Sequence, residues 1–296
     1  MDRGDKWWVS VVPDDAVPER RDLDTGIPHI ARVYDYWLGG KDNFAADRKV
    51  GDETIAAWPI IPEGVRGVRA FLGRAVRYLA GEAGITQFLD IGTGIPAANN
   101  THEVAQALAP DARVVYVDND PIVLAHARAL LVGVSAPTAY VDADAREPEK
   151  ILAEAARTLD FSKPVAVLLI SLLHLIPDAD QPRRIVETLV SAVPPGSYLA
   201  LTHMASDLMP ERTADIRDRL NRALPEQHTF RTREQVARFF GDLDIVPPGV
   251  VRLPEWRPAS PDDTANPVPQ WGGIGRKSLS RTIPPDSPPA TLLPVT

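Results

Sequence analysis

Acidic residues follow three successive apolar segments of the chain, and their type and spacing suit a ligand that carries hydroxyl and amino groups. Asp90 stands two residues before the first glycine of the turn Gly92-Thr93-Gly94, Asp118 ends the next apolar segment, and Asp144 follows the third. Glycines in such a turn let the backbone bend tightly and approach a ligand closely. A carboxylate after the second segment can accept hydrogen bonds from both hydroxyls of a ribose, and one after the third can accept from an adenine amino group.

The same acidic residues also have plainer interpretations. Residues 118–121 form a turn-like sequence, in which we assign Asp120 to capping a helix that begins at Pro121 and Asp118 to the ligand. Asp142 and Asp144 both come at the end of the third apolar segment, and of the two the spacing favours Asp144 as the contact to the ligand. Asp90 has the alternative role of anchoring the glycine turn by accepting backbone N–H bonds, which is compatible with ligand binding.

The elements that must position these residues form an alternating pattern from about residue 85 onward. Strands are expected at 85–91, 113–117, 138–141, 165–170, 197–202, 243–253 and 275–283, and helices at 99–108, 121–131, 148–158, 181–193 and 204–224. Residues 45–79 are expected to form two or three further helices. This pattern predicts an α/β fold with a Rossmann-like, doubly wound, mostly parallel seven-stranded sheet and an N-terminal helical lid layer. The carboxyl ends of parallel strands meet at one edge of a sheet, where such folds bind ligands.

The two ends of the chain differ in composition from the middle. We expect a flexible N-terminal arm over residues 1–24 and a disordered tail over residues 284–296, where prolines crowd and apolar residues are scarce. Between them we expect a single domain over residues 25–283, in which a helical layer (25–84) precedes the Rossmann-like core (85–283).

The three acids in this order resemble those of the class I S-adenosylmethionine-dependent methyltransferases. The resemblance implies that Asp90 lies beside the methionine end of the cofactor, that Asp118 holds the ribose and that Asp144 contacts the adenine. Residues 169–178 (Leu-Ile-Ser-Leu-Leu-His-Leu-Ile-Pro-Asp) are similar to the segment that lies under the sulfonium and faces the acceptor in those enzymes. We therefore expect S-adenosyl-L-methionine as the cofactor, bound by Asp90, Gly92, Thr93, Gly94, Asp118, Asn119, Asp144, Ala145 and Ser171.

A narrower resemblance extends over nearly the whole chain. Residues 31–44, 100–105, 255–258 and 272–277 look like signatures, in this order, of a bacterial S-adenosyl methyltransferase subfamily formerly catalogued as a domain of unknown function. In the first signature, Tyr34, Gly39 and Gly40 are expected to belong to a lid over the methionine end of the cofactor, with Arg32 or Lys41 near the cofactor carboxylate. The alternative for this segment is a turn between helices.

Two histidines are candidates for a catalytic base. His174 follows the fourth expected strand and could take a proton from an acceptor, because imidazole titrates near neutral pH. His203 follows the fifth strand at the same edge and is the weaker candidate. The alternative for both is a buried, hydrogen-bonded structural histidine. Methyl transfer depends mainly on the alignment of nucleophile, methyl group and leaving sulfur, so the absence of a base would not exclude the activity.

Composition narrows the classes of function. The chain has 296 residues, no cysteine and a formal net charge of −8. The lack of cysteine excludes disulfides, thiolate metal sites and a catalytic thiol, and we expect no metal site. The negative charge argues against binding of nucleic-acid backbones, and the sequence shows neither a membrane span nor a secretory signal. We therefore expect a cytoplasmic protein that acts on a small molecule, without a nucleic-acid or membrane partner.

The leading interpretation is thus a methyltransferase with a small-molecule acceptor, and two alternatives stay open. A nicotinamide-dependent oxidoreductase is one, because Gly92, Gly94 and Ala97 formally match the dinucleotide fingerprint and Asp118 follows them. Hydride transfer, however, needs neither Asp90 nor Asp144 at its position. The other alternative is a catalytically silent S-adenosylmethionine-binding protein.

Overall fold

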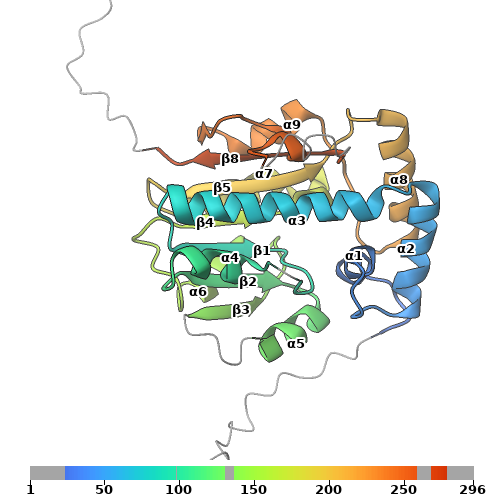
Figure 1. Ribbon diagram of the computed structural model, residues 1–296, viewed down its shortest axis with the longest axis horizontal. Helices are drawn as coiled ribbons and strands as arrows, with labels where there is room; N and C mark the ends of the chain where they lie inside the picture. The colour runs from blue at the N-terminus through green and yellow to red at the C-terminus, as the bar shows by residue number, and fades with distance from the viewer. Residues whose placement is uncertain (1–23, 98, 131–136, 259–267, 279–296) are drawn as a thin grey trace, which may run out of the picture.

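A computed structural model describes residues 24–97, 99–130, 137–258 and 268–278 of the chain (Figure 1). The expected arm (apart from its last residue) and the expected tail lie outside the described residues. The strands are β1 (Gln87–Ile91), β2 (Arg113–Asp118), β3 (Thr138–Asp142), β4 (Ala166–Leu169), β5 (Tyr198–Met204), β6 (Asp244–Ile245), β7 (Val251–Arg252) and β8 (Gln270–Arg276). The helices are α1 (Ile30–Leu38), α2 (Ala45–Ala57), α3 (Ile61–Arg77), α4 (Thr101–Leu108), α5 (Pro121–Leu130), α6 (Pro148–Ala155), α7 (Pro182–Ser191), α8 (Pro210–Ala223) and α9 (Arg233–Ala237). Short helical turns are η2 (Tyr78–Glu82), η3 (Leu173–Leu175), η4 (Asp178–Asp180), η5 (Arg238–Phe240) and η6 (Leu253–Glu255).

Within the described residues, eight strands form one sheet in the order β3-β2-β1-β4-β5-β8-β6, with β7 also paired to β8. Strands β1 to β5 are parallel. Strand β8 is antiparallel to β5, β6 and β7. The chain proceeds from β1 outward through β2 and β3, and then returns to the other side of β1 for β4 and β5. The order therefore reverses at β1, and open sheets of this kind bind ligands beyond the carboxyl ends of the strands at such a point.

The sheet matches the expected mostly parallel class, but its last strands differ from the expectation. The segment expected as one strand over 243–253 forms β6 and β7 separately, because Pro247 and Pro248 lie between them and proline has no N–H to donate. The last strand was expected over 275–283, but β8 covers Gln270–Arg276, and residues 279–283 lie outside the described residues. The glycines of β8 obscured this strand in the sequence, because glycine is rare in strands. Packing explains why they are there: a Cβ at Gly275 would lie 2.8 Å from Cδ1 of Phe240.

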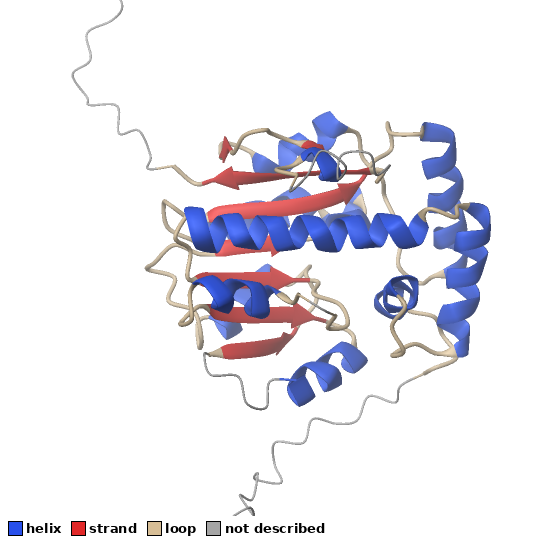
Figure 2. Cartoon of the chain, viewed as in Figure 1, coloured by secondary structure: helices blue, strands red, loops and turns tan. Residues whose placement is uncertain are grey.

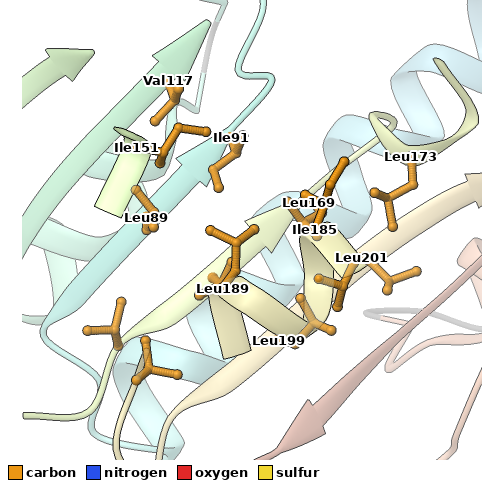
Figure 3. Packing of buried hydrophobic residues seen from close by; sticks show 14 of the residues in the cluster. Leu89, Ile91, Val117, Ile151, Leu169, Leu173, Ile185, Leu189, Leu199 and Leu201 are labelled. Atoms are coloured by element: carbon orange, nitrogen blue, oxygen red, sulfur yellow. The ribbon is translucent and has the colours of Figure 1, made fainter. Parts of the chain in front are cut away.

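Two hydrophobic cores lie on the two faces of the sheet. On one face, α6 and α7 bury Ile151, Ile185 and Leu189 against strand residues such as Leu89 and Leu169 (Figure 3). On the other face, the long helix α3 and η2 pack on the sheet together with Trp256 (Figure 1). Residues of β1 and β4 are buried without alternation, as expected for central parallel strands covered on both sides.

A third cluster holds a helical layer at the carboxyl end of the parallel strands. It joins Val33 and Trp37 of α1, Val50 of α2, Val65 of α3 and Leu220 of α8. Figure 2 shows α1, α2 and α8 beyond the arrowheads of the parallel strands, whereas the long helix α3 runs across the sheet and reaches them with one end. The expected N-terminal helical layer is therefore present, with two additions: residues 30–38 form a helix, and α8 joins the layer from the C-terminal half. Helix α8 starts at Pro210, not at residue 204 as expected, because β5 runs on to Met204. No helix in the described ranges has the length and apolarity needed to cross a bilayer.

Candidate functional site

A cavity lies at the point where the strand order reverses, between the carboxyl edge of the sheet and the helical layer. We call it the edge cavity. It encloses about 1220 Å³ of empty space, its open mouth included. Its lining contains most of the residues expected to hold a cofactor: Tyr34, Asp90, Gly92, Thr93, Gly94, Asp118, Asn119, Asp144, Ala145 and Ser171. The fold thus brings together residues that lie up to 137 positions apart in the chain, between Tyr34 and Ser171.

Asp118 ties the glycine turn to the end of β2. Its Oδ2 accepts a hydrogen bond from the Gly94 N–H at 2.8 Å, and its Oδ1 accepts one from the Asp120 N–H at 3.0 Å. Gly92 and Gly94 both have positive φ angles (73° and 66°), which favour glycine. A Cβ at Gly92 would lie 2.6 Å from Cδ1 of Leu172. Burial raises the pKa of Asp118, and the two backbone hydrogen bonds oppose this rise.

Asp90 is the last residue but one of β1, beside this turn, and is almost fully buried. Its Oδ2 accepts a hydrogen bond of 2.6 Å from the Thr101 hydroxyl, at the start of α4. Burial raises the pKa of Asp90 to about 6, against the opposing effects of the Thr101 hydrogen bond and the nearby Arg69 guanidinium. A carboxyl group with such a pKa changes its charge close to neutral pH.

Asp144 lies in the loop after β3 and faces Asn119 across the mouth of the cavity. The Asn119 amide donates to Oδ2 of Asp144 at 3.2 Å, and the Arg146 N–H donates to Oδ1 at 2.8 Å. The neighbouring acid, Asp142, pairs directly with Asp118 in the β2–β3 register but does not belong to the cavity lining. This placement agrees with the preference of the sequence analysis for Asp144.

Asp120 caps α5, as predicted from the sequence: its Oδ1 accepts a hydrogen bond from the Ile122 N–H at 2.8 Å. Its other oxygen lies 2.9 Å from Nδ1 of His29, whose Nε2 lies 3.1 Å from the Glu226 carboxylate. Burial lowers the pKa of His29, but the hydrogen bond and charge of Asp120 and the charge of Glu226 outweigh burial, so the net shift is upward. His29 therefore joins the helical layer to the loop after β2.

The edge cavity also contains charged residues that the sequence analysis did not assign to it, among them His29, Arg69 and Glu226. They come from the start of α1, the middle of α3 and the loop after α8. Each is an ordinary polar residue of its own segment, and only the packing of the helical layer brings it to the sheet. No short-range sequence pattern could have indicated them.

Gly39 and Gly40 do not belong to the lining, although they were expected to bind the cofactor. Gly39 ends α1 in the left-handed conformation, with φ 83°. A Cβ at Gly40 would overlap the carboxylate of Asp35, which accepts hydrogen bonds from the Asp42 N–H (2.9 Å) and the Asn43 amide (2.8 Å). The glycine pair therefore serves the turn between α1 and α2, which was the alternative interpretation of this segment.

The cavity wall contributed by this segment is one face of α1: Tyr34, Asp35 and Leu38. Arg32 and Lys41, expected near the cofactor carboxylate, are not in the lining either. Arg32 is buried, with its guanidinium donating to the Ile27 carbonyl at 2.7 Å and lying 3.5 Å from Asp47. The cation that does line the cavity near Asp90 is Arg69 of α3.

A second cavity lies next to the edge cavity, between the helical layer and the ends of β4 and β5. We call it the histidine cavity, since His174 and His228 both line it. It encloses about 650 Å³ of empty space, its mouth included. The two cavities share Ile30, Tyr34 and Ser171. Ser171 has a positive φ of 55°, an unusual conformation for a residue other than glycine, and its N–H donates to the Thr202 hydroxyl at 2.8 Å.

The two candidate catalytic histidines lie in different surroundings. His174 lines the histidine cavity, and its Nδ1 has no hydrogen-bond partner among the described residues. His203 lines neither of the two cavities. Its Nδ1 lies 2.8 Å from the Met204 carbonyl, to which it must donate, and its Nε2 accepts from the Arg231 guanidinium at 2.8 Å. Both ring nitrogens of His203 are therefore engaged, as in a structural histidine.

Burial is the main reason why the pKa values of these imidazoles are low. It lowers the pKa of His203 to about 3 and that of His174 well below its usual value, and the positive charge of Arg231 adds to both effects. At neutral pH both rings are therefore uncharged. A neutral His174 ring has one nitrogen with a free lone pair, which can accept a hydrogen bond or a proton.

A doubly wound sheet with a glycine turn after β1 and acids after β1, β2 and β3 around one cavity defines a Rossmann-like protein that binds a nucleoside-containing cofactor. Comparison with known protein families identifies the family to which the chain belongs. The chain belongs to the S-adenosyl methyltransferase family, whose sequence model matches residues 16–278. It is therefore an S-adenosylmethionine-dependent methyltransferase, and S-adenosyl-L-methionine is its cofactor.

Solved structures of two bacterial proteins resemble the chain over most of its length. A DUF574-family protein from Streptomyces avermitilis MA-4680 is 40% identical, with a TM-score of 0.82, and the match covers 86% of this chain and 99% of that one. A protein from Thermobifida fusca YX, to which a methyltransferase activity has been ascribed, is 44% identical, with a TM-score of 0.83 and coverages of 89% and 100%. A search of curated proteins finds no match. The family and fold expected from the sequence are thus confirmed.

Proposed function

We propose that this methyltransferase binds its cofactor in the edge cavity and transfers the methyl group to a small-molecule acceptor in the histidine cavity. The observation that carries the proposal is the convergence of the carboxylates of Asp90, Asp118 and Asp144 on one cavity beside the glycine turn. These groups fit S-adenosylmethionine, which carries ribose hydroxyls, an adenine amino group and a cationic methionine end. When bound, the cofactor supplies an electrophilic methyl group on its sulfonium.

Each acid has a role that follows from its surroundings. Asp118 accepts the ribose hydroxyls, since it stands at the end of β2 with its carboxylate already oriented by two backbone N–H groups. Asp144 accepts from the adenine amino group, and Asn119 orients it. Asp90 pairs with the cationic methionine end. Arg69 lies close enough to Asp90 to lower the pKa of that carboxyl. A guanidinium at this position suits a partner for the carboxylate of the cofactor.

The boundary between the two cavities is where methyl transfer would occur. Ser171 and Tyr34 line both, and His174 lies three residues after Ser171 on the acceptor side. The cofactor would supply the methyl group there, and its sulfur would keep the electron pair of the C–S bond when an acceptor oxygen takes the methyl. The hydroxyl proton leaves to the free lone pair of the neutral His174 ring. The lowered pKa of His174 makes this ring a weak base, so alignment at the boundary contributes more of the rate than proton transfer.

The proposed cofactor site is tested by ligand binding to the full-length protein. S-adenosylhomocysteine is expected to raise the melting temperature by about 5 °C or more at 100 times its Kd, because a ligand bound only by the folded state stabilises that state. Differential scanning calorimetry measures the melting temperature and isothermal titration measures the Kd. NAD is the comparison ligand in both experiments. A shift with NAD and none with millimolar S-adenosylhomocysteine would overturn the proposal in favour of a nicotinamide site.

The pKa of Asp90 predicts how cofactor affinity depends on pH. Its value of about 6 means that Asp90 is protonated below that pH, where it can no longer pair with the cationic methionine end. Affinity for S-adenosylmethionine is therefore expected to fall by up to about tenfold for each pH unit below 6. The stability of the free protein depends on pH in the opposite direction. The pKa of Asp90 in the folded state lies above the ordinary 3.8, so the folded protein loses stability as the pH rises from about 4 to 6.

Titrations from pH 5 to 7.5 check this dependence, and Asp90→Asn is the control. The variant is expected to bind S-adenosylmethionine more weakly at pH 7.5 and with a flatter pH profile, because the titrating carboxyl is gone. A wild-type affinity that stays constant from pH 7.5 down to 5 would show that Asp90 does not contact the charged end of the cofactor.

A further inference from the structure

The histidine cavity differs from the edge cavity in its charge. The edge cavity is lined by several carboxylates and by Arg69 and Arg146. Among the described residues that line the histidine cavity there is no Asp, Glu, Lys or Arg. Its walls are mainly isoleucine and aromatic side chains, among them Trp37, Trp58 and Phe230. A charged group placed there would lose its hydration without gaining a counter-ion. The penalty for burying an unpaired ion in this way is large.

Besides hydroxyl, amide and indole groups, the lining of this cavity contains two imidazoles, those of His174 and His228. The ring of His228 lies with Nδ1 3.1 Å from the Glu226 carbonyl, and a carbonyl can only accept, so Nδ1 carries the proton. Its Nε2 is therefore a bare acceptor. That atom is shut off from solvent and has no hydrogen-bond partner within the described part of the chain.

His174 adds a second unpartnered ring nitrogen. Its ring centroid lies 6.1 Å from that of His228, and its Nδ1 is likewise buried without a partner among the described residues. Burial lowers the pKa of both imidazoles, that of His228 to about 4, so both rings are neutral at pH 7. Unpaired buried polar atoms are costly, and proteins rarely keep two of them together in an apolar wall without a ligand or water to satisfy them.

We propose, on the basis of the methyltransferase function above, that the histidine cavity selects an uncharged, largely apolar acceptor that presents a hydroxyl or N–H group to His174 and His228. The apolar and aromatic walls bury the body of the acceptor. The imidazole pair accepts the hydrogen bond of its single donor group, and thereby directs that group toward the boundary at Ser171. Amines that are protonated at neutral pH, carboxylates and phosphates are excluded because the cavity offers them no counter-ion.

Three naphthalenes of nearly equal shape test the selection: 2-naphthol, 2-methoxynaphthalene and 2-naphthoate. Only the first is a neutral donor, and the third is an anion at pH 7. Isothermal titration of the full-length protein at pH 7, with and without S-adenosylhomocysteine, is expected to give 2-naphthol at least tenfold higher affinity than 2-methoxynaphthalene. Binding of 2-naphthoate is expected to be weaker than both. In His228→Phe, which keeps a ring but removes the acceptor, the advantage of 2-naphthol over 2-methoxynaphthalene should shrink to about threefold or less.

The location of the probe is tested with a substitution that fills the cavity. Gly64 of α3 lines the histidine cavity but not the edge cavity, and a Cβ added there would meet no heavy atom within 4 Å. Leucine is also a better helix former than glycine. Gly64→Leu is therefore expected to fold, to lower 2-naphthol affinity by tenfold or more and to leave S-adenosylhomocysteine affinity unchanged. The matched control is Ala70→Leu on the exposed face of the same helix, which should change neither.

The possible results separate the two proposals. If S-adenosylhomocysteine does not bind, the proposed function fails, whereas the naphthalenes still report on the cavity because they do not need the cofactor. If S-adenosylhomocysteine binds but the three naphthalenes bind equally, or 2-naphthoate binds best, the acceptor class inferred here is wrong. Unchanged binding of 2-naphthol in Gly64→Leu would place the probe outside the histidine cavity and would equally overturn the inference.

Discussion

Replacing Asp118 by alanine is expected to weaken binding of S-adenosylhomocysteine by about 10- to 100-fold. The substitution removes the proposed acceptor of the ribose hydroxyls, and unpaired desolvated hydroxyls cost about 1–3 kcal/mol. It also releases the Gly94 and Asp120 N–H groups, which the carboxylate holds at 2.8 and 3.0 Å, so the glycine turn loses its anchor. Isothermal titration of the purified variant measures the effect.

Asp142→Ala is the matched control for this prediction. Asp142 ends the neighbouring strand directly opposite Asp118 in the sheet, but it is exposed and does not line the edge cavity. Its loss should change the affinity less than twofold. Asp118→Asn serves if the alanine variant does not fold, since the amide oxygen can still accept one backbone hydrogen bond. Equal affinities of wild type and both Asp118 variants would return this residue to a purely structural role in its turn.

Replacing Arg231 by methionine is expected to lower the free energy of unfolding by about 3–5 kcal/mol, because several buried acceptors lose their donor and each such loss costs about 1–3 kcal/mol. The guanidinium is almost fully buried and donates to the carbonyls of Leu173 (2.9 Å) and Ile176 (3.0 Å), to His203 (2.8 Å) and to the Asp178 carboxylate. These carbonyls flank His174. Without the arginine, the Ile176 carbonyl loses this donor and the Leu173 carbonyl keeps only the Ile176 N–H (3.3 Å), so the segment that carries His174 loses support.

Urea denaturation measures this loss, and Arg233→Met is the control. Arg233 is exposed, donates to the Val250 carbonyl at 2.7 Å and lies over the Trp271 ring, so its replacement should cost about 1 kcal/mol or less. Hydrogen exchange adds a local measurement: the Leu175 and Ile176 amides, which are bonded within the turn that carries His174, should exchange faster in Arg231→Met. Similar stability losses in the two variants would contradict the supporting role of Arg231.

The part of the site that sequence reasoning predicted is the part built from local signals. Asp90, Asp118 and Asp144 each follow a strand of a parallel sheet, so chain order alone brings them to one edge. The glycine turn is recognisable because Gly92 and Gly94 need positive φ angles that few other residues adopt. Such features depend on neighbours close in sequence and on one topological rule.

The remainder of the site depends on tertiary packing. Arg69 is one polar residue on an amphipathic helix, and nothing in its own segment separates it from a solvated arginine. The pair Gly39 and Gly40 led to the opposite error, because a glycine signals an unusual backbone without saying whether a ligand or a side chain requires it. At Gly40 it is the side chain of Asp35 that requires a glycine. Strand β8 was placed too late for a similar reason: its glycines accommodate Phe240 and Leu253, which are distant in sequence.

The helical layer has a hydrophobic core of its own, separate from the cores on the two faces of the sheet. Both cavities take their walls from this layer and from the sheet. A ligand in the edge cavity would therefore contact both the layer and the sheet, and separating the two while it is bound would cost the contacts with that ligand in addition to the protein's own. A ligand bound there is therefore expected to reduce local opening of the helical layer, which also forms part of the wall of the histidine cavity.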